Sequence, residues 1–280
     1  MELLFKRIAL VGRHQTEGMA DLLLDLADHL RAHGLQVSLE KECLLPMTDT
    51  VRQRASAYSV LEKTALISKV DLVVVVGGDG TLLSIAREIA PYGLPIIGVN
   101  QGRLGFMTDI PREEMHSAIL AILQGACQPE ERILLEGEVS RNGQILCQST
   151  ALNEVLFSRG AMGSLIDFEL FIDGKFVYSQ RSDGLIVSTP TGSTAYALAS
   201  GGPILHPTIR AIALVPICPQ SLSNRPIVVN DTSVVEFVLL KAQDCRVHYD
   251  GHTHFDLQPH DRVTIRRYHS RVKLLHPLNY

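Results

Sequence analysis

Apolar and polar positions in the first third of the chain alternate between continuous apolar runs and amphipathic segments. Residues 7–11 (RIALV) form an apolar run that ends at Gly12. Over residues 19–30 apolar side chains recur on one helical face, and Gly34 marks the end of this predicted helix. Residues 35–39 (LQVSL) return to a strand pattern. The order strand, helix, strand is the repeating unit of a parallel sheet.

The same order occurs again in the middle of this region. Residues 71–76 (DLVVVV) are apolar after the first position, as expected for a strand that is covered on both faces. The strand ends at residues 77–80 (GGDG), a helical pattern runs from Thr81 to Ala90, and residues 95–99 (PIIGV) form the next strand. The sequence therefore predicts an α/β fold with an N-terminal Rossmann-like parallel sheet domain.

From about Ile133 the pattern changes to short β-rich runs. Three of the turns between them carry the dipeptide signal of a tight hairpin, at Asn142-Gly143, Asp173-Gly174 and Asp250-Gly251. We expect strands at residues 168–172, 185–188, 212–215, 234–240 and 262–265. The predicted organisation is an α/β nucleotide-binding domain at 1–125, which ends with a connecting helix over 112–124, and a mostly β, β-sandwich-like domain at 126–280. In this organisation the extreme C-terminus could pack back on the first domain.

Composition narrows the class of protein. The 280 residues are 46% hydrophobic and 20% charged, which is typical of a globular protein with a large core. A net charge of −4 provides no global positive field, so we expect neither a nucleic-acid partner nor a membrane partner. The five cysteines contain no C-x-x-C pair. The first residues lack the pattern of a signal peptide, and no apolar run reaches the length of a membrane span, so we expect neither. We therefore expect reduced thiols and a cytoplasmic location.

The GGDG turn is the first candidate for chemistry. Gly77, Gly78 and Gly80 let the backbone approach a bulky anion, and the start of a helix favours phosphate. Asp79 would repel that phosphate unless it accepts a hydroxyl proton or works with Mg²⁺. The alternative is an ordinary strand-to-helix turn, for which glycine and aspartate are common. Two familiar phosphate motifs, G-x-x-x-x-G-K-[ST] and a G-x-G-x-x-G after the first strand, are absent, as is the G-x-S-x-G of serine hydrolases.

Two further segments are candidates for binding. Residues 181–203 (RSDGLIVSTPTGSTAYALASGGP) contain a strand and then six small or turn-forming residues at 189–194. Hydroxyl and N–H groups there suit ribose and phosphate oxygens, although such residues also cap and shape turns. The Asn153-Glu154 pair could bracket a ribose diol or a base edge. Taken alone, this pair is more often an exposed strand end.

These three segments, in this order, resemble the signatures of the NAD kinase family. Residues 100–106 (NQGRLGF) and the segments at 216–219 and 225–227 also fit the family pattern, and the likeness extends from about Phe5 to His276. A lone GGDG also occurs in lipid kinases and phosphofructokinases, whereas TPTGSTAY is highly specific. A lipid kinase and a non-catalytic NAD(P)-binding sensor are the alternative functions.

The resemblance implies that the enzyme phosphorylates the 2′-hydroxyl of the adenosine ribose of NAD to give NADP. The substrates would be NAD and ATP, or another phosphate donor, with Mg²⁺ or another divalent metal. An NAD-binding β domain would follow the nucleotide-binding domain, with the active site in the cleft between them. The chain would form a homodimer or homotetramer. Asp79 would be the catalytic residue that accepts the hydroxyl proton.

Residues at matching positions are expected to contact the nucleotides, and they fall into three sets. The set at the glycine turn and the loop after the next strand is Gly77, Gly78, Asp79, Gly80, Thr81 and Phe106. The set in the β domain is Asn153, Glu154, Ser164, Arg181 and Asp183. The set in and after the TPTGST turn is Thr191, Ser193, Thr194, Ala195, Tyr196, Ala197, Leu198 and Ala199.

The chain departs from the family pattern at two positions. Gln220 stands where many relatives have histidine, and His252 stands where relatives have a glutamine, so His252 is expected to take over any nucleotide contact of that residue. His248, His254 and His260 lie near His252, but they lack the ligand set of a typical zinc site. We assign no metal ligand from the sequence.

Overall fold

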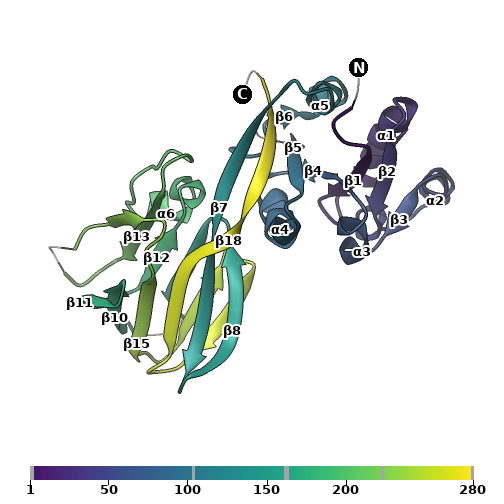
Figure 1. Ribbon diagram of the computed structural model, residues 1–280. Helices are drawn as coiled ribbons and strands as arrows, with labels where there is room; N and C mark the ends of the chain where they lie inside the picture. Colours follow the sequence, from purple (N-terminus) through teal and green to yellow (C-terminus); the bar gives the residue numbers. More distant parts are fainter. Residues whose placement is uncertain (1–2, 103–104, 161–163, 222–223, 279–280) are drawn as a thin grey trace. The chain divides into compact units, whose positions relative to one another are not determined.

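The computed structural model describes residues 3–102, 105–160, 164–221 and 224–278. It divides into two compact units (Figure 1). The first unit comprises residues 1–131 together with 272–280, and the second comprises residues 132–271. Within the described ranges, no helix combines the length and the apolar composition that crossing a membrane requires.

A parallel sheet forms the centre of the first unit. Its strand order is β18-β5-β4-β1-β2-β3, and every pair is parallel. The strands are β1 (Arg7–Gly12), β2 (Gln36–Glu40), β3 (Ser59–Leu61), β4 (Leu72–Gly77), β5 (Pro95–Asn100) and the end of β18 (Arg262–Pro277), and the short β6 (Ile110–Pro111) also pairs with β5. The predicted Rossmann-like sheet is confirmed.

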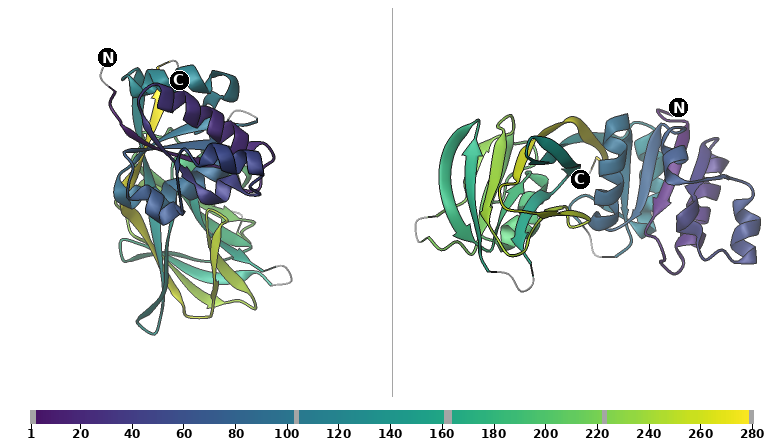
Figure 2. Two further views of the ribbon diagram at one scale, coloured as in Figure 1. Left: turned by 90° about the vertical axis from the view of Figure 1, so that its right-hand side faces the viewer. Right: turned by 90° about the horizontal axis from the view of Figure 1, so that it is seen from below.

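Helices cover both faces of this sheet. They are α1 (Met19–Ala32), α2 (Asp49–Ala55), α3 (Lys63–Ile67), α4 (Asp79–Ile89) and α5 (Met115–Leu123), with 3₁₀ turns η1 (Lys41–Leu44), η2 (Ala90–Tyr92) and η3 (Arg112–Glu114). Figures 1 and 2 show α1 and α5 on one face and α3 and α4 on the other. The apolar stripe predicted for the first helix is buried in α1. This two-sided cover is the reason that every residue of β4 is buried.

The helix after the GGDG turn begins earlier than its hydrophobic pattern predicts. The sequence placed its start at Thr81, whereas α4 begins at Asp79 and Gly78 occupies the N-cap position. The first N–H groups of a helix have no acceptor within the helix itself. Glycine at the N-cap has no side chain that could accept hydrogen bonds from them. Asp79 therefore lies in the first turn of α4, where the helix dipole favours a negative charge.

Two antiparallel sheets form the second unit. One has the order β11-β10-β15-β18, with β7 on β18 and β8 on β7, and the other has the order β14-β13-β12-β9-β16-β17. The strands are β7 (Cys127–Arg141), β8 (Gln144–Ala151), β9 (Glu154–Arg159), β10 (Ile166–Ile172), β11 (Lys175–Ser182), β12 (Gly184–Ser188), β13 (Ala211–Ile217), β14 (Ile227–Asn230), β15 (Val235–Lys241), β16 (Cys245–Tyr249) and β17 (Thr253–Leu257). The prediction of a mostly β second domain is confirmed.

The core of the second unit lies between its two sheets. Alternate residues from both sheets point into it, and three aromatic rings occupy its centre. Phe157 of β9 stacks on Phe237 of β15 with ring centroids 3.9 Å apart, and Phe168 of β10 stacks on Phe237 at 4.7 Å. Such stacked rings add to the burial energy of a core.

The three predicted hairpin turns are confirmed. They join β7 to β8, β10 to β11 and β16 to β17. Asn142, Asp173 and Asp250 each have φ of 51°, and the glycine that follows each of them also has positive φ. Positive φ at both central positions defines the type I′ turn, whose twist matches that of antiparallel strands.

Strand β12 is buried on both faces, which fixes the segment that follows it. Leu185 and Val187 belong to the core between the sheets, whereas Ile186 packs on the outer side with Ala197 of the short helix α6 (Tyr196–Ala199). A 3₁₀ turn, η4 (Thr191–Thr194), connects β12 to α6. The TPTGST segment therefore lies at the carboxyl end of a strand that is held from two sides.

Candidate active site

Asp79 is held by the loop that follows β5. Its Oδ1 accepts hydrogen bonds from Met107 N (3.2 Å), Thr108 N (3.1 Å) and Thr108 Oγ1 (3.1 Å), and its Oδ2 accepts one from Phe106 N (2.9 Å). Asn100, at the end of β5, supports the same loop, because its Nδ2 donates to Thr108 Oγ1 (3.0 Å). The four donors fix the carboxylate in one orientation at the carboxyl ends of β4 and β5.

The two oxygens of this carboxylate differ in their remaining capacity to accept hydrogen bonds. Among the residues that the structure describes, Oδ1 accepts three hydrogen bonds and Oδ2 accepts one. A carboxylate oxygen has two lone-pair directions. Oδ2 therefore retains the capacity to accept a proton from a hydroxyl group or to contact a cation.

Gly105 is necessary for this arrangement. A Cβ built on Gly105 would lie 2.3 Å from Asp79 Oδ1 and 2.8 Å from Oδ2. Replacing Gly105 by alanine is therefore expected to push the carboxylate away from its donors. For a reaction in which this carboxylate takes part, kcat should fall by roughly 10–100-fold, since a misplacement of 1 Å can cost this much. Steady-state kinetics of Gly105→Ala beside Gly102→Ala checks this, because a Cβ on Gly102 meets no described atom within 4 Å. Equal activity in both variants would contradict it.

The glycines of the GGDG turn have unequal surroundings. A Cβ on Gly77 would lie 2.7 Å from Thr81 Oγ1, so this glycine is required by close packing. A Cβ on Gly78 or Gly80 would meet no atom of the described residues within 4 Å. The open side of the turn, together with the N–H groups of the first helical turn, suits a phosphate group.

Asp250 organises the candidate binding segment of the second unit. Its Oδ2 accepts a hydrogen bond from Leu152 N (2.7 Å), and its Oδ1 accepts bonds from Asn153 N (2.7 Å) and Glu154 N (3.1 Å). The backbone of Asp250 also donates to Glu154 O (3.1 Å). One aspartate in the β16–β17 turn thus accepts hydrogen bonds from three consecutive N–H groups at the start of β9.

The TPTGST turn packs directly against the Asn153-Glu154 pair. Thr189 N donates to Asn153 O (2.9 Å), and Thr189 Oγ1 donates to Leu152 O. A Cβ on Gly192 would lie 2.2 Å from Asn153 O, so only glycine permits this approach. The structure therefore brings together two of the three segments that the sequence singled out.

Several hydroxyl groups of this turn serve the turn itself. Ser193 is fully buried, its Oγ donates to Pro190 O (2.6 Å), and it accepts a bond from Leu205 N (3.0 Å). Thr191 Oγ1 accepts a hydrogen bond from Arg132 Nη1 (3.2 Å). The turn-shaping role that sequence reasoning left open applies to these residues, while the side chains of Tyr196, Leu198 and Ala199 in α6 are exposed.

Glu154 is not the exposed strand end that the sequence pattern favours. It is 8% exposed, because β9 lies between β12 and β16 in its sheet. Its Oε2 has no hydrogen-bond partner among the residues that the structure describes. Burial, and next the negative charge of Asp250, raise the pKa of Glu154 to about 7. A buried carboxyl with a free oxygen is well suited to bind hydroxyl groups of a ligand.

The raised pKa of Glu154 predicts a pH-dependent stability. From the ordinary pKa of 4.5 up to about 7 the folded chain retains a proton that the unfolded chain releases, so the free energy of unfolding falls as the pH rises. Glu154→Gln removes this penalty. We expect the variant to gain up to about 3 kcal/mol over the parent chain at pH 8 and little at pH 4.5. Urea unfolding at both pH values measures it, and a pH-independent difference would contradict it.

The remaining predicted residues lie elsewhere in the two units. Arg181 is exposed, with Nε 3.4 Å from Asp167 Oδ1, and Asp183 pairs with Arg159. Arg181 lines a pocket of about 430 Å³ that also includes Gln220. Ser164 and His252 are exposed in loops, and Phe106 is 68% exposed. The backbone N–H of Phe106 donates to Asp79, whereas no described contact joins Arg181, Asp183, Ser164 or His252 to Glu154.

The histidines of the last hairpin do not gather into a described metal-ligand group. His248 and His254 face each other across β16 and β17 with ring centroids 5.7 Å apart. Within the described ranges, the one group of three metal-ligating side chains is His14, Glu40 and Cys43, in the first unit.

Sequence reasoning missed three supporting residues. Thr108 and Asp250 fix the two candidate segments, and Arg132 is buried beside Thr191. The Asp250-Gly251 dipeptide was a signal, but it indicated only a turn. Arg132 lies just before the β-rich region predicted from about Ile133, and no pattern indicated its role.

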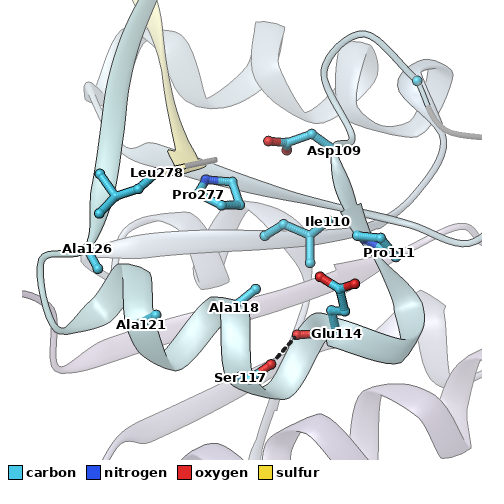
Figure 3. A pocket seen from close by; sticks show the side chains of 11 residues that line it. Asp109, Ile110, Pro111, Glu114, Ser117, Ala118, Ala121, Ala126, Pro277 and Leu278 are labelled. Atoms are coloured by element: carbon cyan, nitrogen blue, oxygen red, sulfur yellow. Dashed lines mark hydrogen bonds between the residues drawn. The ribbon is translucent and has the colours of Figure 1, made fainter. Parts of the chain in front are cut away.

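A separate pocket of about 750 Å³ lies within the first unit (Figure 3). Ala118 and Ala121 of α5 line it together with Ile110, Pro277 and Leu278. It shares Gly105 with the loop that holds Asp79, but its lining is mostly small and apolar. Close to it, the buried His276 contacts Asp109 Oδ2 and Glu130 Oε2, each at 3.1 Å.

Matches to known proteins extend over nearly the whole chain. The model for the ATP-NAD kinase N-terminal domain matches residues 8–127, and that for the ATP-NAD kinase C-terminal domain matches residues 152–276. The NAD kinase of Chromobacterium violaceum is 58% identical over 280 residues, which are 100% of this chain and 94% of that relative. The NAD kinase of Laribacter hongkongensis is 53% identical over the same 280 residues, with 100% and 94% covered.

Solved structures agree with the fold. Yeast NADH kinase, solved with NADH, matches with a TM-score of 0.86 at 22% identity and covers 99% of this chain and 84% of that chain. An NAD kinase from Archaeoglobus fulgidus, solved with ATP, matches with a TM-score of 0.73 at 26% identity and covers 97% and 94%. None of these matches supports a lipid kinase or a non-catalytic sensor. The chain belongs to the NAD kinase family.

Proposed function

We propose that this enzyme transfers the terminal phosphoryl group of ATP to the 2′-hydroxyl of the adenosine ribose of NAD, with Asp79 as the proton acceptor. The catalytic assignment rests on the orientation of Asp79. This residue lies in a glycine turn at the start of a helix, and four donors in the loop after β5 fix its carboxylate. The family supports the reaction. As the 2′-oxygen bonds to the γ-phosphorus, the bond from that phosphorus to ADP breaks and the hydroxyl proton passes to Asp79.

The glycine turn is the proposed site for the donor phosphates. Gly78 and Gly80 leave room beside the first turn of α4, and Gly77 and Thr81 pack below it. The described carboxylates near the turn do not form a group that would enclose a magnesium ion, but Asp79 Oδ2 has a free lone-pair direction. Magnesium is commonly held by substrate phosphates and one or two carboxylates, so these residues fit an ion that arrives with the nucleotide. Such an ion would offset charge on the transferring phosphoryl group.

The Asn153-Glu154 segment is the proposed site for the adenosine half of NAD. Asp250 and the TPTGST turn fix its backbone, and Glu154 Oε2 is free among the described atoms to accept hydrogen bonds from ribose hydroxyls. Positioning a reactant in this way removes entropy from the step that follows. Ser193 and Thr191 act in the proposal by shaping the turn, whereas Tyr196 and the exposed side of α6 offer surface to the ligand.

One assay tests the proposed reaction. Purified protein is incubated with NAD, Mg²⁺ and either ATP, another nucleoside triphosphate or polyphosphate, and NADP is detected with an NADP-specific dehydrogenase. NADP formed with at least one donor supports the proposal. Tight NAD binding without NADP would instead indicate a sensor, and labelled phosphate on diacylglycerol would indicate a lipid kinase.

We also propose that the chain forms a homodimer or homotetramer and that it is cytoplasmic. Light scattering after size exclusion tests the oligomeric state.

A further inference from the structure

A second cluster of reactive side chains lies in the first unit, outside the proposed active site. His14 follows β1, Glu40 ends β2, and Cys43 lies in the 3₁₀ turn η1 after it. One ligand atom from each of these residues lies within 4.8 Å of the other two. Because β1 and β2 are parallel neighbours, their carboxyl ends meet at one edge of the sheet. The pairing of these strands therefore brings the three side chains together.

Glu40 Oε2 is the common contact of the cluster. His14 Nε2 lies 3.2 Å from it, and Cys43 Sγ donates a hydrogen bond to it at 2.8 Å. Glu40 is 1% exposed and Cys43 is 2% exposed, while His14 remains on the surface. A carboxyl group and a thiol group are thus buried in contact with each other. A cation bound between them would offset the negative charge that they carry when they are ionised.

The surroundings of the cluster match the outer contacts of a metal centre. His14 Nδ1 lies 3.3 Å from Glu42 Oε2, so that carboxylate can accept the proton of the ring nitrogen that faces away from Glu40. Metal-bound histidines usually donate their second nitrogen to such a group. Cys43 Sγ donates to Gly12 O (3.3 Å) and accepts a hydrogen bond from Gly12 N (3.0 Å), and the second of these bonds would persist if zinc replaced the thiol proton.

One positive group lies close to Glu40. Lys63 Nζ is 3.8 Å from Glu40 Oε1, whereas His14 and Cys43 contact Oε2, and Lys63 pairs more closely with Glu88 at 3.1 Å. Glu40 Oε1 has no hydrogen-bond partner among the described residues. Lys63 therefore offsets part of the charge of Glu40 at the oxygen that His14 and Cys43 do not contact.

We propose that His14, Glu40 and Cys43 form a zinc site that ties the turn after β1 to the end of β2. One imidazole, one thiolate and one carboxylate are ligands that zinc accepts in tetrahedral geometry, with water or another group in the fourth position. Sulfur and imidazole ligands disfavour Mg²⁺ and Ca²⁺, so the site is distinct in chemistry from the magnesium that accompanies ATP. On binding, zinc replaces the thiol proton, which passes to solvent.

Metal titration of the chelator-stripped full chain tests the site. Zinc is added in competition with a chromophoric chelator, and Co²⁺ is used as a spectroscopic substitute. We expect one zinc per chain and a sulfur-to-cobalt charge-transfer absorption. His14→Gln and Cys43→Ser should each weaken zinc binding at least 100-fold, and Glu42→Gln by about 10–100-fold. The matched control is Cys218→Ser, which removes an exposed cysteine outside the cluster and should bind like the parent chain.

The outcomes separate a metal site from a fortuitous cluster. Circular dichroism first establishes which variants fold, and His14→Gln carries the test if Cys43→Ser does not, because His14 lies on the surface. In the parent chain, zinc should also raise Tm, and His14→Gln should abolish that rise. Zinc binding that survives His14→Gln, or a cobalt spectrum without a sulfur band, would overturn the proposal. NADP formation is not a readout here, so failure of the proposed reaction would leave this test intact.

Discussion

Replacing Asp79 by asparagine is expected to lower kcat by about 10²–10⁴-fold with little change in KM for NAD, because general-base assistance contributes a factor of this size. Asparagine keeps the shape of the side chain and one acceptor oxygen. The other oxygen becomes an NH₂ group, which cannot take a proton from the ribose hydroxyl. Steady-state kinetics with saturating ATP measures the effect.

A comparison variant separates this chemical role from simple positioning. Thr108→Val removes one of the four donors to Asp79 but leaves its carboxylate in place. We expect the valine variant to lose no more than about 10-fold in kcat, far less than the asparagine variant. Near-normal turnover by Asp79→Asn would refute the assignment of Asp79 as the proton acceptor. Equal large losses in both variants would show that orientation, and not proton transfer, is the main contribution.

Replacing Asp250 by asparagine should give the second large effect, on stability and on NAD binding together. The asparagine side chain has one acceptor oxygen for three N–H groups, and the buried Leu152 N–H would face an NH₂ group. We expect the free energy of unfolding to fall by about 2–3 kcal/mol. Because residues 152–154 lose their support, KM for NAD should rise at least 10-fold. Urea unfolding and kinetics measure the two effects.

A matched control exists in another hairpin of the same unit. Asp173 also has φ of 51° before a glycine, and it accepts bonds from Ser233 Oγ (3.1 Å) and Val234 N (2.8 Å) on the protein surface. Asparagine tolerates this backbone conformation, as Asn142 already shows. Asp173→Asn should cost less than about 1 kcal/mol and leave KM unchanged. If both variants behave alike, Asp250 has no special role in the NAD segment.

Local patterns predicted the elements of the fold better than their long-range pairing. The apolar run before Gly77 and the three dipeptide turns were read correctly, because hydrophobic period and turn chemistry act over a few residues. The start of α4 was placed too late, since Asp79 and Gly80 are polar or small and the helical pattern begins after them. The pairing of β18 with β5 joins Leu274 to Ile96, and no local signal reports so distant a contact.

The candidate site shows the same division. Glycine-rich and hydroxyl-rich segments were visible because each is a short run of neighbouring residues at the end of a predicted strand. The hydrogen bonds from Thr108 to Asp79 and from Asn153 to Asp250 were not, because they depend on where separate loops meet in the fold. The exposed position favoured for Glu154 was wrong for a related reason: burial of a strand end is decided by its neighbours β12 and β16, which come later in the chain.

The order in which the ribosome delivers the chain gives β18 a further importance. The sheet of the first unit gains its last strand from Lys273 and Leu274, which are translated after all of the second unit. His276 follows these residues in the chain, so its contacts with Asp109 and Glu130 also form late. Burial lowers the pKa of His276, but the hydrogen bonds to these two carboxylates outweigh burial and raise it. During synthesis the edge of β5 at Pro95 and Ile96 stays without this partner. The unit that is translated first is thus completed last, and until then its open strand edge exposes the nascent chain to aggregation, which is a situation that chaperones counter.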